Sequence, residues 1–165
     1  MRLATLVILL ISAAPALAQQ RPLVTEDPET IGAGRMLLEG GIDYGRDILF
    51  PASGLTGDLL RAPLIGVSIG LSSIAELQFD GGLYNRLSVT DRRPAPFSEG
   101  LDFTGDTTSD VEDIVVATKV RILGEGTARP SIGIRFATKL PNTSNESGLG
   151  LDTTDFHLTG LVAKT

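Results

Sequence analysis

The sequence predicts an all-β fold, namely an antiparallel up-and-down transmembrane β-barrel of which about six strands are present. Apolar residues alternate with polar or small ones at a period of two through most of the chain after residue 34, which places them on one face of each strand. The connections between these runs alternate in length, and the chain opens with an apolar leader. No run after the leader shows a convincing helical period of 3.6 residues.

The first 18 residues have the features of a secretory signal peptide. Arg2 supplies a positive charge, Leu3–Ala14 is an apolar core too short to span a bilayer, and residues 16–18 (Ala-Leu-Ala) form a small-x-small cleavage site. An N-terminal membrane anchor is the alternative, but no basic stop-transfer flank follows. We therefore divide the chain into a signal peptide (1–18), a periplasmic N-terminal segment (19–33) and an incomplete barrel (34–165).

Charge and cysteine content narrow the class of protein. The 165-residue chain has a formal net charge of −6 and no Cys, and cleavage after residue 18 removes Arg2 and leaves −7. An acidic exported protein is a poor nucleic-acid binder, and export without disulfides fits a bacterial envelope. We expect the bacterial outer membrane as the location, its lipid as a partner, and no nucleic acid or cofactor.

Each predicted strand has an apolar and a polar face. In Arg35–Gly45 the even positions include Met36 and Leu38, whereas the odd positions include Glu39 and Asp43. Each run is about 10 residues long, which matches a tilted strand that spans a membrane. Five further runs continue this pattern, the last with ambiguous faces: Pro63–Leu71, Ser73–Leu87, Asp113–Leu123, Ser131–Leu140 and Asp155–Thr165.

The predicted connections alternate between long and short. Long polar segments occupy roughly residues 48–58, 90–110 and 141–154, and short turns lie near 71–73 and 124–128. Membrane barrels have this order, with long outer loops and short periplasmic turns.

The two short turns also predict a strand register. The turn near Ser72 pairs Val67 with Leu77, and the turn near Gly126 pairs Lys119 with Arg135. Apolar side chains then meet on one face of each hairpin, and a slip of one residue would break this match.

Alternation alone does not say which way the apolar face points. A soluble lipocalin-like barrel places apolar side chains inside, whereas a membrane barrel places them outside. Charges near strand centres, the alternating connections and the strand lengths favour the membrane barrel. The six Phe, two Tyr and absent Trp provide no strong aromatic girdle, which argues against it.

In a membrane barrel the charged residues line the lumen. Lys119 and Arg135 would then face each other and repel, so they need an acidic neighbour. Internal salt bridges that fill a narrow barrel are one interpretation, and a charged constriction that sets selectivity is the other. The lumen candidates are carboxylates on the first and third strands (Glu39, Asp43, Glu76, Asp80) and cations on the fourth and fifth (Lys119, Arg121, Arg135, Lys139).

The segment Arg21–Arg35 cannot form a regular strand, because Pro22 and Pro28 remove backbone donors. It is either a solvated linker or a small plug in the lumen. As a plug, it would bring carboxylates to the basic fourth and fifth strands: Glu26, Asp27 and Glu29.

About six strands do not close a bacterial barrel, for which about eight, in an even number, are the minimum. The sequence stops at residues 161–165, inside a strand pattern. We therefore expect the chain to be truncated.

Two stretches resemble a known family: PLVTEDPETIGAGRMLLEGGIDY (Pro22–Tyr44) and DIVVATKVRILGEGTARPSIGIRFATKLPNTSNESGLGLDTTDF (Asp113–Phe156). The family comprises outer-membrane proteins named for the meta pathway of phenol degradation, which are related to hydrophobic-compound channels of the fatty-acid transporter kind. The resemblance covers most of the mature chain. It implies an outer-membrane barrel that passes small, often aromatic or apolar compounds, and it transfers no site residues.

Two further constellations are candidates for chemistry. His157, the only His, lies near Asp155, but a Gly-x-Ser-x-Gly elbow is missing, so we expect no enzyme. An acidic loop could bind calcium, although its spacing does not match an EF-hand loop. These weak calcium candidates are Asp102, Asp106 and Asp110.

Together these observations predict a passive channel or uptake porin for small hydrophobic or aromatic solutes. Three alternatives stay open. They are a structural outer-membrane barrel without transport, a soluble secreted barrel that binds an apolar ligand, and a barrel enzyme that uses His157.

Overall fold

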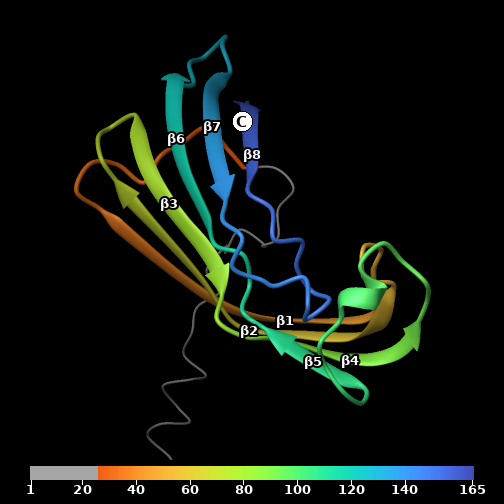
Figure 1. Ribbon diagram of the computed structural model, residues 1–165. Coiled ribbons are helices and arrows are strands. Elements are labelled where there is room, and N and C mark those ends of the chain that lie inside the picture. Colours follow the sequence, from red (N-terminus) through yellow and green to blue (C-terminus); the bar gives the residue numbers. More distant parts are fainter. Residues whose placement is uncertain (1–25) are drawn as a thin grey trace, which may run out of the picture.

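A computed structural model describes residues 26–165 (Figure 1). The predicted signal peptide and the start of the predicted N-terminal segment lie outside these residues. The described chain contains no helix long and apolar enough to cross a membrane. Its elements are a 3₁₀ turn η1 (Ser98–Gly100) and the strands β1 (Met36–Phe50), β2 (Leu55–Gly70), β3 (Ala75–Gly82), β4 (Asn85–Arg92), β5 (Thr107–Asp110), β6 (Val115–Leu123), β7 (Ser131–Lys139) and β8 (Asp155–Ala163).

The eight strands form one antiparallel sheet, which confirms the all-β prediction. β2 pairs with β1 along one edge, and along the other edge it pairs first with β4 and then with β3. β5 pairs with β4, and β6 pairs with β3. β3 and β4 together occupy the position of one predicted strand, Ser73–Leu87. β5 and β6 also share one strand position, but β5 lies in the predicted connection 90–110, so the prediction missed this strand. Six strand positions result.

The sheet is strongly curved (Figure 1) but not closed into a barrel. β6 pairs with β7, and β7 pairs with β8. Within residues 26–165, β1 and β8 each pair with a single neighbour. The predicted antiparallel up-and-down order is thus present, whereas closure is not.

One predicted long connection is wrong. Within the predicted connection 48–58, only residues 51–54 form a turn, because β1 continues to Phe50 and β2 begins at Leu55. Gly54, at φ +73°, donates its N–H to the Phe50 carbonyl at 2.8 Å. The strand extends past its polar residues because Phe50 packs against a buried apolar cluster formed later in the chain. The connections 93–106 and 140–154 are long, as predicted.

The register prediction is confirmed at one hairpin and wrong at the other. Lys119 faces Arg135 as predicted. Val67, however, faces Phe79 rather than Leu77. The hairpin turn explains this shift, because Leu71 donates to the Ala75 carbonyl at 2.9 Å and moves the turn centre. The shift is two residues, so each side chain keeps its face.

The two faces of the sheet differ in what covers them. We call the face that contacts residues 26–34 and the long connections the inner face. In β3, β6, β7, β8, residues 36–41 of β1 and residues 64–70 of β2, the inner face is mainly polar and the outer face is mainly apolar. We call this part the charged-interior half. Its outer face is exposed, for example Leu38 at 70% and Leu158 at 76%.

The remaining part of the sheet has the opposite polarity. In β4, β5 and residues 55–61 of β2, the inner face is apolar, and we call this part the apolar-interior half. Its outer face carries polar side chains such as Arg86 and Thr90. Its core is Leu55, Leu59, Leu87 and Val89, with Ile48, Phe50, Leu101, Phe103 and Leu149 packed against it.

The polarity reverses where the strands are interrupted. Arg61 pairs with Asn85, and the next β2 pair is Leu64 with Gly82. Regular alternation leaves one residue between two inward-facing residues, but two residues lie between these pairs on each strand. The inward-facing residues of β2 therefore change from odd-numbered to even-numbered positions. Residues 111–114 interrupt the next strand position. We call residues 61–64, 82–85 and 111–114 the polarity boundary.

Replacing Leu87 with Ala is expected to lower the free energy of unfolding by roughly 2–5 kcal/mol, because truncation of a buried Leu leaves a cavity. Leu87 is 0% exposed. The adjacent Arg86→Ala changes the exposed outer face and is expected to stay within about 0.5 kcal/mol. Urea unfolding of both variants under identical conditions checks this, and equal losses would contradict the reversed polarity.

Candidate functional site on the inner face

Residues 26–35 lie against the inner face of the charged-interior half. They comprise the described part of the predicted segment 19–33 and the next two residues, and from here on we call them the N-terminal segment. The Gly34 N–H donates to the Gly70 carbonyl at 2.8 Å, and the Gly70 N–H donates to the Arg35 carbonyl at 2.9 Å. The Ile31 N–H donates to Glu76 Oε2 at 2.8 Å. Pro28 is buried against Gly133. The segment is therefore attached to the sheet from Gly70 to β7.

The Glu26 carboxylate lies between Lys119 and Arg135, the two cations that face each other across β6 and β7. Its Oε1 lies 3.1 Å from Lys119 Nζ, and its Oε2 lies 3.1 Å from Arg135 Nε. Gln78 donates to Glu26, and Arg135 Nε also donates to Gln78 Oε1 at 2.7 Å. Glu76 Oε1 lies 3.1 Å from Lys119 Nζ. The repulsion predicted between Lys119 and Arg135 is thus offset by Glu76 from the sheet and by Glu26 from the N-terminal segment.

Glu29 makes the second ionic attachment. It forms an ion pair with Arg121, and Ser131 Oγ donates to its Oε1 at 3.0 Å. Asp27 accepts the Glu29 N–H at 2.8 Å, which stabilises the turn inside the segment. The structure thus places Glu26 and Glu29 on the basic strands β6 and β7, and it gives Asp27 a local contact.

The pKa of Glu26 lies below its ordinary value. Burial by itself raises it, but the hydrogen bond from Gln78 and the positive charges of Lys119 and Arg135 outweigh burial. The carboxylate is therefore ionised at neutral pH, where it binds both cations.

A second ionic group lies at the polarity boundary. Arg61 pairs with Asp43, and its Nη1 lies 3.1 Å from Glu112 Oε1. Lys139 Nζ lies 2.9 Å from Asp113 Oδ2 and 3.0 Å from Asp155 Oδ2.

The other predicted lumen residues lie on the inner face as well. Asp80 lies 3.7 Å from Arg135. Glu39 faces Gly66 across β1 and β2, on the polar side of both strands. The structure places seven of the eight predicted lumen residues in ion pairs: Asp43, Glu76, Asp80, Lys119, Arg121, Arg135 and Lys139.

Sequence reasoning missed several participants: Arg61, Gln78, Asn85, Glu112 and Asp113. Alternation already places Gln78 on the polar face of a predicted strand. It was not among the candidates because its side chain carries no charge. Arg61 and Glu112 lie at strand interruptions that alternation does not reveal. Only the packing of separate strands brings them together.

The calcium candidates do not converge. Asp110 Oδ2 accepts the Ser144 N–H at 2.9 Å and Oγ–H at 2.8 Å, which ties the 140–154 connection to β5. Asp106 is exposed and lies 3.9 Å from Arg92, and Asp102 donates its N–H to the Glu146 carbonyl. In residues 26–165 no group of three or more His, Cys, Asp or Glu side chains is arranged to hold a metal ion. Asp110 instead accepts hydrogen bonds from loop backbone and hydroxyl groups.

His157 lies on β8 opposite Ala137, and its side chain is exposed. Asp155, which the sequence places near it, is paired with Lys139.

Protein-family models, curated proteins and solved structures were compared with this chain, and none of them matches it.

Glu26→Gln is expected to lower the free energy of unfolding by about 1–2 kcal/mol at pH 7, since it removes a charge between two cations that keep other partners. Because the native pKa of Glu26 is lowered, its stabilising effect is fully present above the ordinary value of 4.5. The effect declines below that pH and is lost as the pH falls through the lowered pKa. Unfolding curves of wild type and variant should therefore converge on acidification.

Glu99→Gln is the matched control, because it makes the same change at an exposed position in η1. It should leave the unfolding free energy within about 0.5 kcal/mol of wild type. A Glu26→Gln effect that is absent at pH 7, or that grows on acidification, would contradict the ionic attachment.

Proposed function

We propose that this protein forms the wall of a bacterial outer-membrane β-barrel that acts as a passive channel for small hydrophobic or aromatic compounds. The observation that carries the proposal is the exposed apolar outer face of the charged-interior half, opposite an ion-paired inner face. Water-exposed apolar patches of this extent are unfavourable in a monomeric soluble protein. Lipid satisfies such a face, and a polar interior is typical of membrane barrels.

The height of this apolar face supports a membrane location. β7, which lies wholly in the charged-interior half, has nine residues. At about 3.3 Å per residue such a strand spans roughly 30 Å, and a tilt of about 40° reduces this to roughly 23 Å. Outer-membrane barrels have an apolar band of about 25 Å.

The exposed tyrosines support placing the edge of the lipid bilayer at the polarity boundary. Tyr44 and Tyr84 are the two tyrosines of the chain, and both are exposed near this boundary. Tyr44 faces Leu60, and the Tyr84 carbonyl accepts the Ala62 N–H at 2.9 Å. Tyrosines are enriched where membrane and water meet. The apolar-interior half, with its polar outer face, would then project beyond the lipid.

Two features support passage of apolar solutes. The resemblance to an outer-membrane family related to hydrophobic-compound channels implies such solutes. In the charged-interior half, ion pairing reduces the free charge on the inner face. A neutral solute would therefore pass a wall whose charges are largely neutralised.

We further propose that the N-terminal segment plugs the lumen. Its attachment through Glu26, Glu29 and Gly70 lies on the inner face, and a segment in that place obstructs a pore. Release of the segment would open the path.

A structural barrel without transport is the second candidate. The dense ion pairing of the inner face favours it, because paired side chains can fill a narrow interior. The experiments below separate the two candidates.

The first experiment tests the membrane location. Leu38→Arg places a charge on the outer apolar face and is expected to lower the unfolding free energy in lipid vesicles by roughly 2–4 kcal/mol. Thr90→Arg places the same charge on the polar outer face of β4 and is expected to change it by less than about 0.5 kcal/mol. Equal effects of the two substitutions would count against a lipid-facing outer surface.

The second experiment tests the channel and its plug. A Cβ at Gly70 would lie 1.8 Å from the Gly32 carbonyl oxygen, so Gly70→Ala displaces the segment. A Cβ at Gly41, on the inner face of β1, meets nothing within 4 Å, so Gly41→Ala is the matched control. Planar-bilayer conductance should rise severalfold in Gly70→Ala and in a deletion of residues 21–31, and it should stay unchanged in Gly41→Ala.

If wild type and all variants conduct no ions and pass no solute into liposomes, the structural barrel replaces the channel. If wild type conducts and the deletion leaves conductance unchanged, the channel stands and the plug fails.

A further inference from the structure

The sheet holds the Glu26 carboxylate as it would hold the carboxylate of a bound ligand. Lys119 Nζ and Arg135 Nε each lie 3.1 Å from one of its oxygens, and the Gln78 side-chain amide donates to it. Lys119 is 4% exposed, so its ammonium group is largely removed from water. Hydrogen bonds from charged donors to a carboxylate are about twice as strong as those between neutral groups. These three side chains of β3, β6 and β7 form a first carboxylate position.

A second carboxylate position lies beside the first. Glu29 pairs with Arg121, and Ser131 Oγ donates to Glu29 Oε1 at 3.0 Å. Arg121 and Lys119 are two residues apart on the inner face of β6, so their backbones are roughly 7 Å apart at about 3.3 Å per residue. The donors of both positions belong to the sheet, whereas both carboxylates belong to the N-terminal segment. The two positions therefore remain when the segment leaves.

The N-terminal segment sets the sign of the charge around these positions. Three cations of β6 and β7 form salt bridges with two carboxylates of β3 and two of the segment: Lys119, Arg121 and Arg135 with Glu76, Asp80, Glu26 and Glu29. With the segment in place, the carboxylates of this group outnumber the cations by one. Without the segment, the cations outnumber the carboxylates by one. Displacement of the segment therefore leaves two carboxylate positions and an excess of positive charge.

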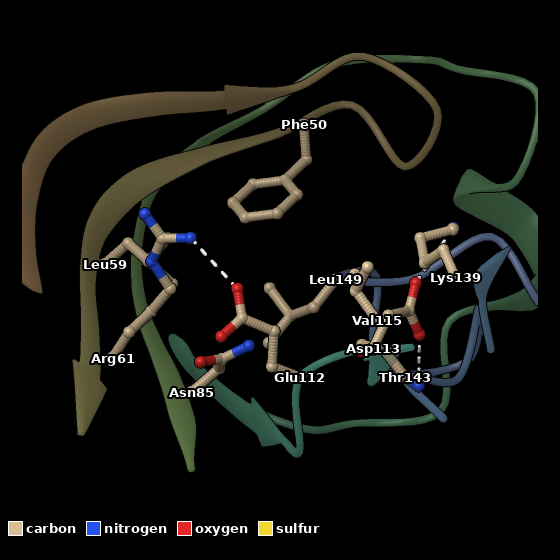
Figure 2. A pocket seen from close by; sticks show the side chains of 10 residues that line it. All are labelled: Phe50, Leu59, Arg61, Asn85, Glu112, Asp113, Val115, Lys139, Thr143 and Leu149. Atoms are coloured by element: carbon tan, nitrogen blue, oxygen red, sulfur yellow. Dashed lines mark hydrogen bonds and ion pairs between the residues drawn. The ribbon is translucent and has the colours of Figure 1, made fainter. Parts of the chain in front are cut away.

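The cations at the polarity boundary differ from these three. They line a cavity of about 270 Å³ (Figure 2). Each of them has two carboxylate partners on the strands and connections: Asp43 and Glu112 for Arg61, and Asp113 and Asp155 for Lys139. These carboxylates do not belong to the N-terminal segment, so its displacement leaves them in place. A carboxylate solute is therefore expected at the positions of Glu26 and Glu29 and not in this cavity.

We propose that the inner face of β6 and β7 binds a small dicarboxylate, whose two carboxylates take the places of Glu26 and Glu29. The N-terminal segment is then an internal competitor for this solute. The inference rests on displacement of the segment, which the proposed plug also requires, and it adds dicarboxylates to the solutes of the proposed channel.

The probe is adipate, a linear dicarboxylate, and its matched control is adipamide, which has the same chain but two neutral amides. Calorimetry with the full chain in phosphatidylcholine nanodiscs, with empty nanodiscs subtracted, measures saturable binding. Gly70→Ala displaces the segment, because its Cβ would lie 1.8 Å from the Gly32 carbonyl oxygen, and Gly41→Ala is the control.

Gly70→Ala and the deletion of residues 21–31 are expected to bind adipate about tenfold or more tightly than wild type and Gly41→Ala. This is the range for a charge-assisted hydrogen bond that no longer has an internal competitor. Adipamide is expected to show no saturable binding to any of these proteins.

Substitutions in the deletion variant test the two positions. Arg121→Gln and Arg135→Gln are each expected to weaken adipate binding severalfold. Arg129→Gln makes the same change at an exposed residue of the β6–β7 turn and should leave binding unchanged. Should Arg135→Gln fail to fold, the comparison of Arg121→Gln with Arg129→Gln still decides.

The dicarboxylate site is overturned if the deletion variant does not bind adipate, if it binds adipamide equally well, or if wild type binds adipate as tightly as the deletion variant. Equal behaviour of Arg121→Gln and Arg129→Gln also overturns it. A deletion that raises conductance without binding adipate removes this site and leaves the channel and its plug. Adipate binding to a protein that does not conduct keeps the site and removes the channel.

Discussion

The structure depends on the salt bridges that Glu26 forms with Lys119 and Arg135. Antiparallel pairing of β6 and β7 places the two cations opposite each other, an arrangement that is unfavourable without a carboxylate between them. Glu76 and Asp80 of β3 reach Lys119 and Arg135 separately, whereas Glu26 is the one carboxylate among residues 26–165 that bridges both cations. The charge pattern of the sheet therefore favours the N-terminal segment on its inner face, and it links the conformation of that segment to the protonation of one carboxyl group.

The reversal of polarity along the sheet links fold and environment. In the charged-interior half the apolar side chains face outward, and in the apolar-interior half they face inward and form a conventional core. Two uninterrupted strands could not do this, because strict alternation keeps each face constant. One residue more than strict alternation allows, at the same level of β2 and of β3–β4, changes the face of both strands together. A single sheet thereby suits two solvents, which we propose to be lipid and water.

The inner face divides into an ionic part that the N-terminal segment covers and an apolar part that the long connections cover. A cavity of about 270 Å³ lies where the two parts meet, and its wall combines ion-paired side chains with apolar surface.

The sequence by itself determined most of the strands, their antiparallel order and the Lys119–Arg135 register, because each follows from alternation at a period of two. It also indicated that Glu26 and Glu29 could meet the basic strands. Only the tertiary structure decided that the apolar face points outward in the charged-interior half and inward in the apolar-interior half. It also decided that β5 is a strand, that residues 51–54 form a tight turn and that the β2–β3 hairpin is shifted by two residues. It alone brought Arg61, Asn85 and Glu112 together at the polarity boundary. Local periodicity does not contain these features, because they depend on contacts between strands that are distant in the chain.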